Sequence, residues 1–195
     1  MGLLDILLGR TKPVAADLDR LFALPSAAVT LEAASGFTPT GQGAVCFATV
    51  EGGAFEQTHR EVRALLDADT ERDGPPVELR QDDYGYSWLV SRRAPDQLHA
   101  LVNDLHAVNS QMEVNGFGPQ LLCSLAGFRD RAGRRLALVY LYKRGTFYAF
   151  APQPGGETQR RDNALELQVR AALAGDLRIE QDLGRWFPVW GAPGL

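Results

Sequence analysis

The sequence predicts an α+β protein in which a largely antiparallel sheet has helices packed mainly on one face. Short apolar strand patterns follow one another through turn-forming residues, which favours antiparallel pairing over helical crossovers. Other segments place apolar residues at helical spacing, and a ββα order recurs loosely along the chain. With 195 residues and 45% hydrophobic residues, we expect one globular domain over residues 1–195.

The N-terminal third predicts a helix followed by a hairpin. Residues 15–24 carry apolar side chains at helical spacing, and Pro25 is expected to end that helix. Residues 28–34 and 43–50 have strand-like composition, and the turn formers between them favour an antiparallel hairpin. The GQG at 41–43 precedes a strand, whereas a nucleotide-binding fingerprint follows one, so we interpret it as the hairpin turn.

The middle of the chain predicts two helices around a strand pair. An amphipathic helix is expected over 55–69, with His59 on its apolar side. The runs 77–83 and 84–93 indicate two strands joined by a turn. A second helix is expected over 96–112, directly after a proline, which the first turn of a helix tolerates.

Three strands and a capped helix are predicted in the C-terminal half. The strands cover 121–130, 134–142 and 146–152, with tight turns between them. A helix over 163–174 follows, and a short strand is expected over 177–181.

The start of that last helix has the pattern of a capping box. Asn163 is expected to accept from the backbone, Glu166 to reach back, and Gly175 to end the helix.

Charge and cysteine content exclude some classes of function. A net charge of −4 and a pI of about 5.4 lack the basic footprint of a nucleic-acid-binding protein. Cys46 and Cys123 lie in apolar runs, so we expect buried, reduced thiols and a cytoplasmic protein. The opening MGLLDILLGR lacks the pattern of a signal peptide, and no apolar run is long enough to span a membrane.

No motif in the chain indicates a cofactor or a catalytic centre. His99 and His106 stand seven residues apart on one predicted helix, too far for a zinc pair, and a third ligand is not evident. We therefore predict no metal and no nucleotide. The adjacent Asp82 and Asp83 suit a turn better than paired acid–base work. If the protein is an enzyme, its site would be a dispersed polar cluster of His99, His106 and Arg144.

Two apolar terminal segments are candidate docking elements. Residues 1–10 crowd large aliphatic side chains into a short stretch, and the tail over 183–195 carries aromatic residues between prolines. Each could contact a partner or a membrane surface, or could instead pack on the domain's own sheet. The candidate docking residues are Leu3, Leu4, Ile6, Leu7, Leu8, Trp186, Phe187 and Trp190.

Several blocks together resemble one known family. They are MGLLDILLGR, DLDRLFALPSAAVTL, DDYGYSWLV, NGFGPQLLCSLAGF, LVYLYKRGTFYAFAP, RRDNALELQV and DLGRWFPVW. They look like the PspA-associated protein PspAB, a family encoded near PspA-type envelope-stress proteins. Of the two open classes, adaptor and enzyme, we favour a non-enzymatic accessory protein that binds a PspA-like partner or the inner membrane surface. The resemblance implies a soluble protein connected to envelope stress through PspA-like partners. It carries over no catalytic or cofactor-binding residues, so an enzyme of unknown reaction stays the alternative.

Overall fold

A computed structural model describes residues 16–70, 72, 74–153, 155 and 159–195 of the chain. The strands are β1 (Thr38–Ala48), β2 (Glu78–Gln81), β3 (Tyr86–Arg92), β4 (Leu121–Arg129), β5 (Arg135–Leu141) and β6 (Thr146–Phe150). The α-helices are α2 (Leu24–Ser35), α3 (Gly53–Asp67), α4 (Leu98–Met112) and α5 (Asn163–Ala172). Shorter helical turns are η1 (Leu18–Ala23), η2 (Glu113–Phe117), η3 (Gly118–Gln120) and η4 (Leu183–Arg185).

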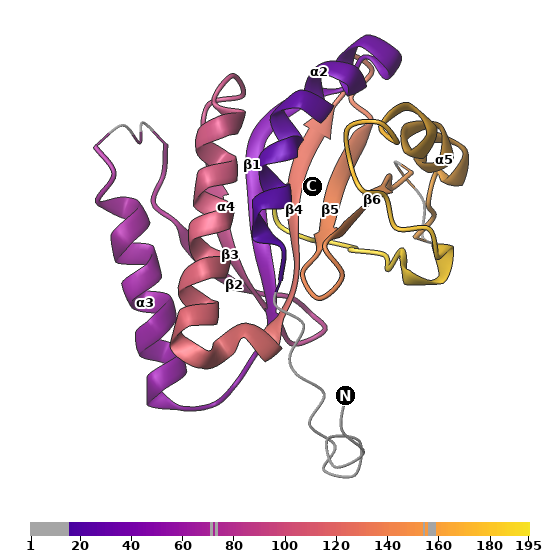
Figure 1. The fold of residues 1–195 in the computed structure, drawn as a ribbon. Helices are drawn as coiled ribbons and strands as arrows, with labels where there is room; N and C mark the ends of the chain where they lie inside the picture. Colours follow the sequence, from indigo (N-terminus) through magenta and orange to yellow (C-terminus); the bar gives the residue numbers. More distant parts are fainter. Residues whose placement is uncertain (1–15, 71, 73, 154, 156–158) are drawn as a thin grey trace, which may run out of the picture.

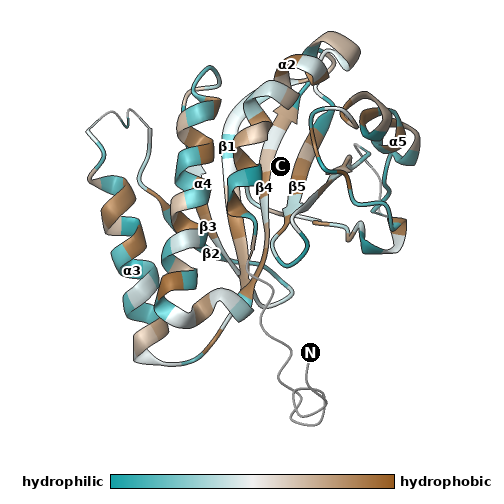
Figure 2. Ribbon diagram, viewed as in Figure 1, coloured by the Kyte–Doolittle hydropathy of each residue, from teal (hydrophilic) through white to brown (hydrophobic). Residues whose placement is uncertain are grey.

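The six strands form one sheet in the order β2-β3-β1-β4-β5-β6, and every neighbouring pair is antiparallel (Figure 1). Helices α2 and α4 cover one face of the sheet, α3 packs against α4, and α5 lies beside β6. Figure 2 shows brown hydrophobic and teal hydrophilic stripes along α3 and α4, as amphipathic packing requires. The predicted α+β class with a largely antiparallel sheet is confirmed.

The strand predicted over 28–34 is wrong, because these residues belong to α2. Alanine is the strongest helix former and is depleted in strands, so this alanine-rich run favours a helix, and Leu31 is fully buried at helical spacing. Pro25 does not end a helix; it lies in the first turn of α2, where its missing N–H costs nothing. Gly36, with φ 73°, ends the helix and donates its N–H to the Glu32 carbonyl.

The predicted N-terminal hairpin is therefore absent, and the GQG lies inside the single long strand β1. The pairing of β1 with β4 shifts register between Pro39 and Gly43, which marks a bulge. Gly41 has φ 75°, and a Cβ there would lie 2.1 Å from the Arg93 carbonyl oxygen. The Arg93 N–H also donates to the Gly41 carbonyl at 2.8 Å. These glycines let β1 bend closely against the end of β3.

Three of the turns predicted between consecutive strands, one in the middle of the chain and two in its C-terminal half, are confirmed. β2 pairs with β3, β4 with β5 and β5 with β6, each through a tight connection. The first turn is organised by Asp82, whose carboxylate accepts from the Tyr84 and Tyr86 N–H groups, both at 2.9 Å. Asp82 and Asp83 thus occupy a turn, as their adjacency predicts.

Strand β1 lies at the centre of the sheet, between β3 and β4. Val45 is opposite Leu89 on β3 and opposite Ser124 on β4. Ser124 receives a hydrogen bond from Asn109 of α4 at 2.8 Å, so this side of the strands faces the helices. The other side carries Cys46 opposite Cys123, and both are buried, free thiols, as predicted.

The start of α5 corrects the predicted capping box by one residue. Asp162, not Asn163, is the N-cap and accepts from the Leu165 N–H at 3.0 Å. Glu166 does not reach back to the cap, because its buried carboxylate accepts from the Ala151 N–H at 2.9 Å. The strand predicted over 177–181 is reduced to one parallel bridge between Ile179 and Phe147.

Within the described part of the chain, no helix combines the length and the apolar character needed to cross a membrane.

His59 is expected to make the fold less stable in mild acid. It lies on the buried side of α3 beside Phe55, with ring centroids 5.8 Å apart, and its Nδ1 has no hydrogen-bond partner. Burial, followed by the nearby Arg63 and Arg60, lowers the pKa of His59 from its ordinary value of 6.5. The folded state therefore binds the proton less readily than the unfolded state, and stability is lost as pH falls through the unfolded pKa.

We expect the melting temperature to fall from about pH 7 to about pH 5, and to fall less in a His59→Leu variant, since histidine is the side chain that titrates there. Melting curves at matched ionic strength measure the difference. Parallel pH profiles for the two proteins would contradict the assignment.

Candidate functional site

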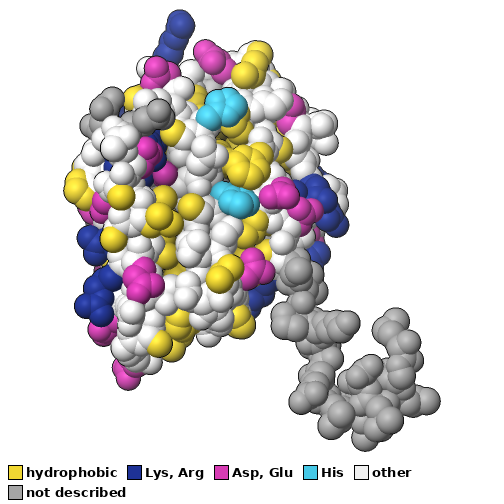
Figure 3. Space-filling view, turned by 60° about the vertical axis from the view of Figure 1, so that its left-hand side comes forward, with side chains coloured by type: hydrophobic (Ala, Val, Ile, Leu, Met, Phe, Trp, Pro, Cys, Tyr) yellow, Lys and Arg dark blue, Asp and Glu magenta, His cyan; other side chains and the backbone are white. Residues whose placement is uncertain are grey.

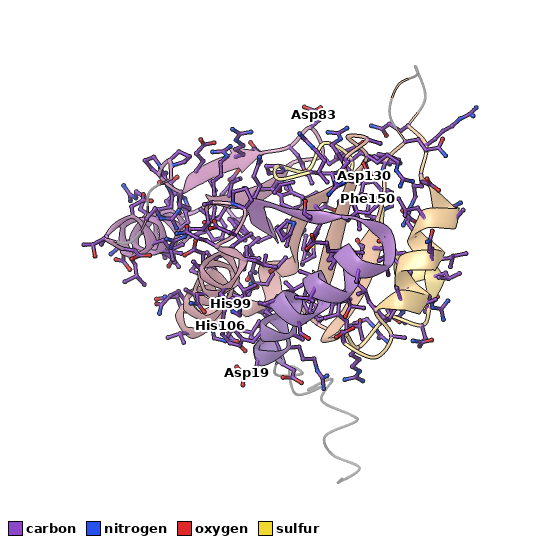
Figure 4. All side chains as sticks on the ribbon, turned by 90° about the horizontal axis from the view of Figure 1, so that it is seen from above. Asp19, Asp83, His99, His106, Asp130 and Phe150 are labelled. Atoms are coloured by element: carbon purple, nitrogen blue, oxygen red, sulfur yellow. The ribbon has the colours of Figure 1, made fainter. Side chains whose placement is uncertain are left out.

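The C-terminal tail, residues 183–195, runs across the sheet face opposite α2 and α4. Figure 4 shows the yellow C-terminal segment on one side of the sheet and His99 and His106 on the other. Trp186 is 5% exposed and packs on Tyr148 with ring centroids 5.8 Å apart. Its indole N–H donates to the Glu180 carbonyl at 3.0 Å. The tail thus folds back on the sheet at this point.

Polar contacts lock the start of the tail in place. The Tyr148 hydroxyl donates to the Phe187 carbonyl at 2.7 Å, and burial raises the pKa of Tyr148, which keeps the hydroxyl protonated. Arg161 donates to the Trp186 carbonyl and pairs with Glu166 at 2.9 Å. Burial raises the pKa of Glu166, while the Arg161 hydrogen bond acts in the opposite direction. The backbone around Trp186 is therefore held from both sides.

Beyond this anchor, aromatic side chains remain open to solvent. Phe187 is 59% exposed, Tyr84 63% and Tyr86 43%. Trp190 is half-buried and meets Phe150 edge-on at 4.9 Å. Tyr86 shares its face of β3 with Trp88, two residues on, which lies beneath the tail. We call Tyr84, Tyr86, Phe187 and Trp190 the aromatic face.

A small cavity of about 220 Å³ opens between the β2–β3 turn and the tail. Its lining residues are Arg80, Gln81, Asp82, Asp83, Tyr84, Trp88, Trp190, Gly191 and Pro193. Trp88 is 3% exposed and donates its indole N–H to the Asp82 carboxylate at 2.8 Å. The same aspartate therefore shapes the turn and fixes one wall of the cavity.

A second cavity, of about 250 Å³, lies between α3 and α4 over a buried ionic cluster. Asp104 accepts from Arg72 at 2.8 Å, from Ser91 at 2.5 Å and from two nitrogens of Arg93 at 2.7 and 2.9 Å. Arg93 also pairs with Asp69 at 2.7 Å. The hydrogen bonds that Arg93 donates to Asp104, and those it donates to Asp69, raise the pKa of Arg93, while burial acts in the opposite direction.

The ionic cluster suits a structural clamp better than a general base. Four hydrogen bonds, three of them from arginine side chains, fill most of the acceptor capacity of the Asp104 carboxylate, so little of it is free to take a proton from a substrate. The cluster ties the loop after α3 to α4 and to the end of β3. Leu65 at the rim of this cavity is 56% exposed. On the side of the molecule shown in Figure 3, hydrophobic side chains reach the surface between charged ones.

Two of the three polar residues suggested for an enzyme site, His106 and Arg144, contact separate acidic residues. His106 Nε2 lies 3.4 Å from Asp19 Oδ1, and its ring is 4.9 Å from that of Phe22. His99 is exposed on the same helix, as Figure 4 shows. Arg144, in the β5–β6 turn, pairs instead with Glu180 at 2.7 Å. Among the described residues, no cluster of three or more His, Cys, Asp or Glu could hold a metal ion.

The candidate docking residues divide between described and undescribed parts of the chain. Trp186 is an internal anchor of the tail, Trp190 is half-buried, and Phe187 points its side chain to solvent. The N-terminal candidates lie outside the described residues. They are Leu3, Leu4, Ile6, Leu7 and Leu8.

Sequence reasoning missed several residues that shape these sites. Tyr86 and Trp88 alternate along β3, and that period of two could have placed them on a common face, whereas Tyr84 lies in the turn before the strand. Asp104 interrupts the apolar stripe of its helix, a sign of a buried, paired acid. The arginines that pair with it, Arg72 and Arg93, follow no periodic pattern and could not be assigned to it.

Comparison with known proteins identifies one family. The family model described as PspAB, PspA associated protein B, matches residues 1–194. No curated protein and no solved structure matches the chain. The family predicted from the sequence blocks is thereby confirmed.

Replacing Asp104 is expected to destabilise the protein strongly. Asp104→Asn leaves two buried guanidinium groups without their shared carboxylate, and breaking a buried pair typically costs about 3–5 kcal/mol. Glu78→Gln is the matched control, since it makes the same chemical change in a surface pair with Arg80 and Arg92 and should cost about 1 kcal/mol or less. Urea unfolding measures both free energies. Equal losses would contradict the role of Asp104 as a clamp.

Proposed function

The chain belongs to the PspA associated protein B family, and from this we propose that it is a non-enzymatic accessory protein that binds a PspA-like partner. The observation that carries the proposal is the family match over residues 1–194. In this proposal the protein acts in an envelope-stress system on the cytoplasmic side of the inner membrane. The alternative docking target is the surface of that membrane.

We propose the aromatic face as the surface that contacts the partner. Tyrosine and tryptophan are enriched at protein interfaces, where they supply large contact areas at low entropic cost. Phe187 stands exposed directly after the buried anchor Trp186, so its backbone is already ordered before binding. Pre-ordering reduces the entropy lost on association. The aliphatic residues of segment 1–10 are proposed as a second contact.

An enzyme built on the predicted polar cluster has less support. His106 lies beside Asp19 and Arg144 pairs with Glu180, so these side chains are satisfied within their own neighbourhoods. The buried carboxylate of Asp104 is likewise occupied by its arginines. None of these groups is arranged as a nucleophile with an adjacent base.

Phe187 is expected to matter for binding and not for stability. Because its side chain is 59% exposed, Phe187→Ala should change the free energy of unfolding by roughly 0.5 kcal/mol or less. If it is an interface anchor, the same variant should weaken binding to a purified PspA-like protein by about tenfold or more. Leu167→Ala on α5, 45% exposed, is the matched control. Identical affinities for the two variants would count against the aromatic face.

Deletion of residues 1–10 tests the second contact. If this segment serves recruitment, the deletion should leave the melting temperature nearly unchanged and should abolish recovery of the partner from stressed cells. Burial of each large aliphatic side chain is worth roughly 1.5–3 kcal/mol, so packing on the chain's own surface predicts a clear loss of stability instead. If the deletion lowers the melting temperature strongly but the partner is still recovered, the recruitment role is contradicted.

A further inference from the structure

We infer that the cavity between the β2–β3 turn and the C-terminal tail binds an arginine side chain of the protein partner. The identity of the partner rests on the proposed function, whereas the preference for a cation rests on the cavity itself. Two indole rings, an exposed phenol and uncompensated carboxylates meet there, on residues that are far apart in the sequence.

The aromatic walls are positioned before any ligand arrives. Trp88 is 3% exposed and is oriented by the 2.8 Å hydrogen bond from its indole N–H to Asp82. Trp190 is held from the other side by its edge-on contact with Phe150. Tyr84 lies at the mouth, 63% exposed. Trp88 is almost wholly enclosed, so the rings open to a ligand are those of the half-buried Trp190 and the exposed Tyr84. The electron-rich faces of such rings attract cations, and arginine is the cation found most often against them.

The hydrogen bonds of Asp82 leave its negative charge uncompensated. Its carboxylate accepts three N–H groups, from Tyr84, Tyr86 and Trp88, and all three donors are neutral. Asp83 is exposed, and its side chain forms no hydrogen bond or ion pair with any described residue. A cation entering the cavity would therefore meet two carboxylates that have no positive partner.

The arginine that lines the cavity does not cancel this charge. Arg80 pairs with Glu78 at 2.7 Å, and Arg92 pairs with the same carboxylate at 2.8 Å. These arginines lower the pKa of Glu78, with Arg92 contributing most, so Glu78 stays ionised. Two arginines thus stand against three carboxylates in this region, which leaves one net negative charge for a ligand to neutralise.

The size of the cavity selects a single side chain. At about 220 Å³ it holds roughly seven waters of about 30 Å³ each, which suits one long side chain and excludes a helix or a nucleotide. Arginine fits better than lysine, because its planar guanidinium can stack on an indole while its N–H groups reach a carboxylate. Tyr84 and Trp190 of the aromatic face line the cavity, so the cavity opens on this face.

The direct test uses N-acetyl-arginine amide as the probe. Two of the three tryptophans line the cavity, so intrinsic fluorescence reports its occupancy. We expect a saturable change in emission that weakens with added salt. N-acetyl-citrulline amide, the neutral analogue of the same shape, should bind at least tenfold more weakly. No saturable response, or equal responses to the two probes, would overturn the inference.

Two variants then connect the cavity to the partner. Asp83→Asn removes an exposed charge without a hydrogen-bond partner, so the fold should be unchanged while the affinity for the arginine probe falls about fivefold or more. Glu32→Gln on α2, over the opposite sheet face, removes the same charge and should have no effect.

If the partner inserts an arginine, Asp83→Asn should also weaken binding of the purified PspA-like protein, and Glu32→Gln should not. If the cavity binds the arginine probe but Asp83→Asn leaves the affinity for the PspA-like protein unchanged, the ligand is not an arginine of this partner, and the assignment to the partner is overturned. The proposed function would still stand in that case, because the Phe187 and 1–10 variants test it separately.

Discussion

The arrangement of this protein depends on the apolar character of both sheet faces. In central strand β1, Val45 faces the helices and Cys46 faces away from them, and both are buried. An antiparallel sheet can leave one face to water only when that face is polar. Here α2 and α4 cover one side, so the C-terminal tail must cover part of the other. The aromatic residues of the tail follow from that requirement.

Buried carboxylates paired with arginine recur where segments distant in sequence are joined. Asp104 gathers Arg72 and Arg93, Glu166 holds Arg161 beneath the tail, and Glu180 binds Arg144 and Thr146. A guanidinium group offers five N–H donors in a fixed plane, so one arginine can satisfy a carboxylate and a backbone carbonyl together. The Arg-rich composition of the chain thus has a structural use in these loops.

The same packing explains why the aromatic face is ordered and yet open. Trp186 is buried, and its indole N–H donates to the Glu180 carbonyl. These contacts fix the backbone that carries Phe187 and Trp190. On the other side of the cavity, the Asp82 carboxylate accepts hydrogen bonds that orient Trp88 and the turn that carries Tyr84. Rigid aromatic groups presented in this way suit the recognition of a protein partner.

Features that depend on neighbouring residues could be predicted from the amino-acid sequence alone. Hairpins between β2 and β3 and along β4, β5 and β6 follow from turn formers between strand patterns, and α3 and α4 follow from apolar periodicity. The period of two from Tyr86 to Trp88 could also have placed Tyr86 of the aromatic face. Alanine is the strongest helix former and is depleted in strands, so the composition of residues 28–34 already favours a helix, but which of its side chains are buried depends on tertiary contacts.

Tertiary structure alone also placed β1 between β3 and β4 and set Trp190 opposite Trp88 across one cavity. These contacts join residues far apart in the chain, and no local periodicity encodes which distant surface a strand or a tail will cover. That choice is made by burial of apolar area over the whole fold, which is a property of the assembled sheet and not of any single segment.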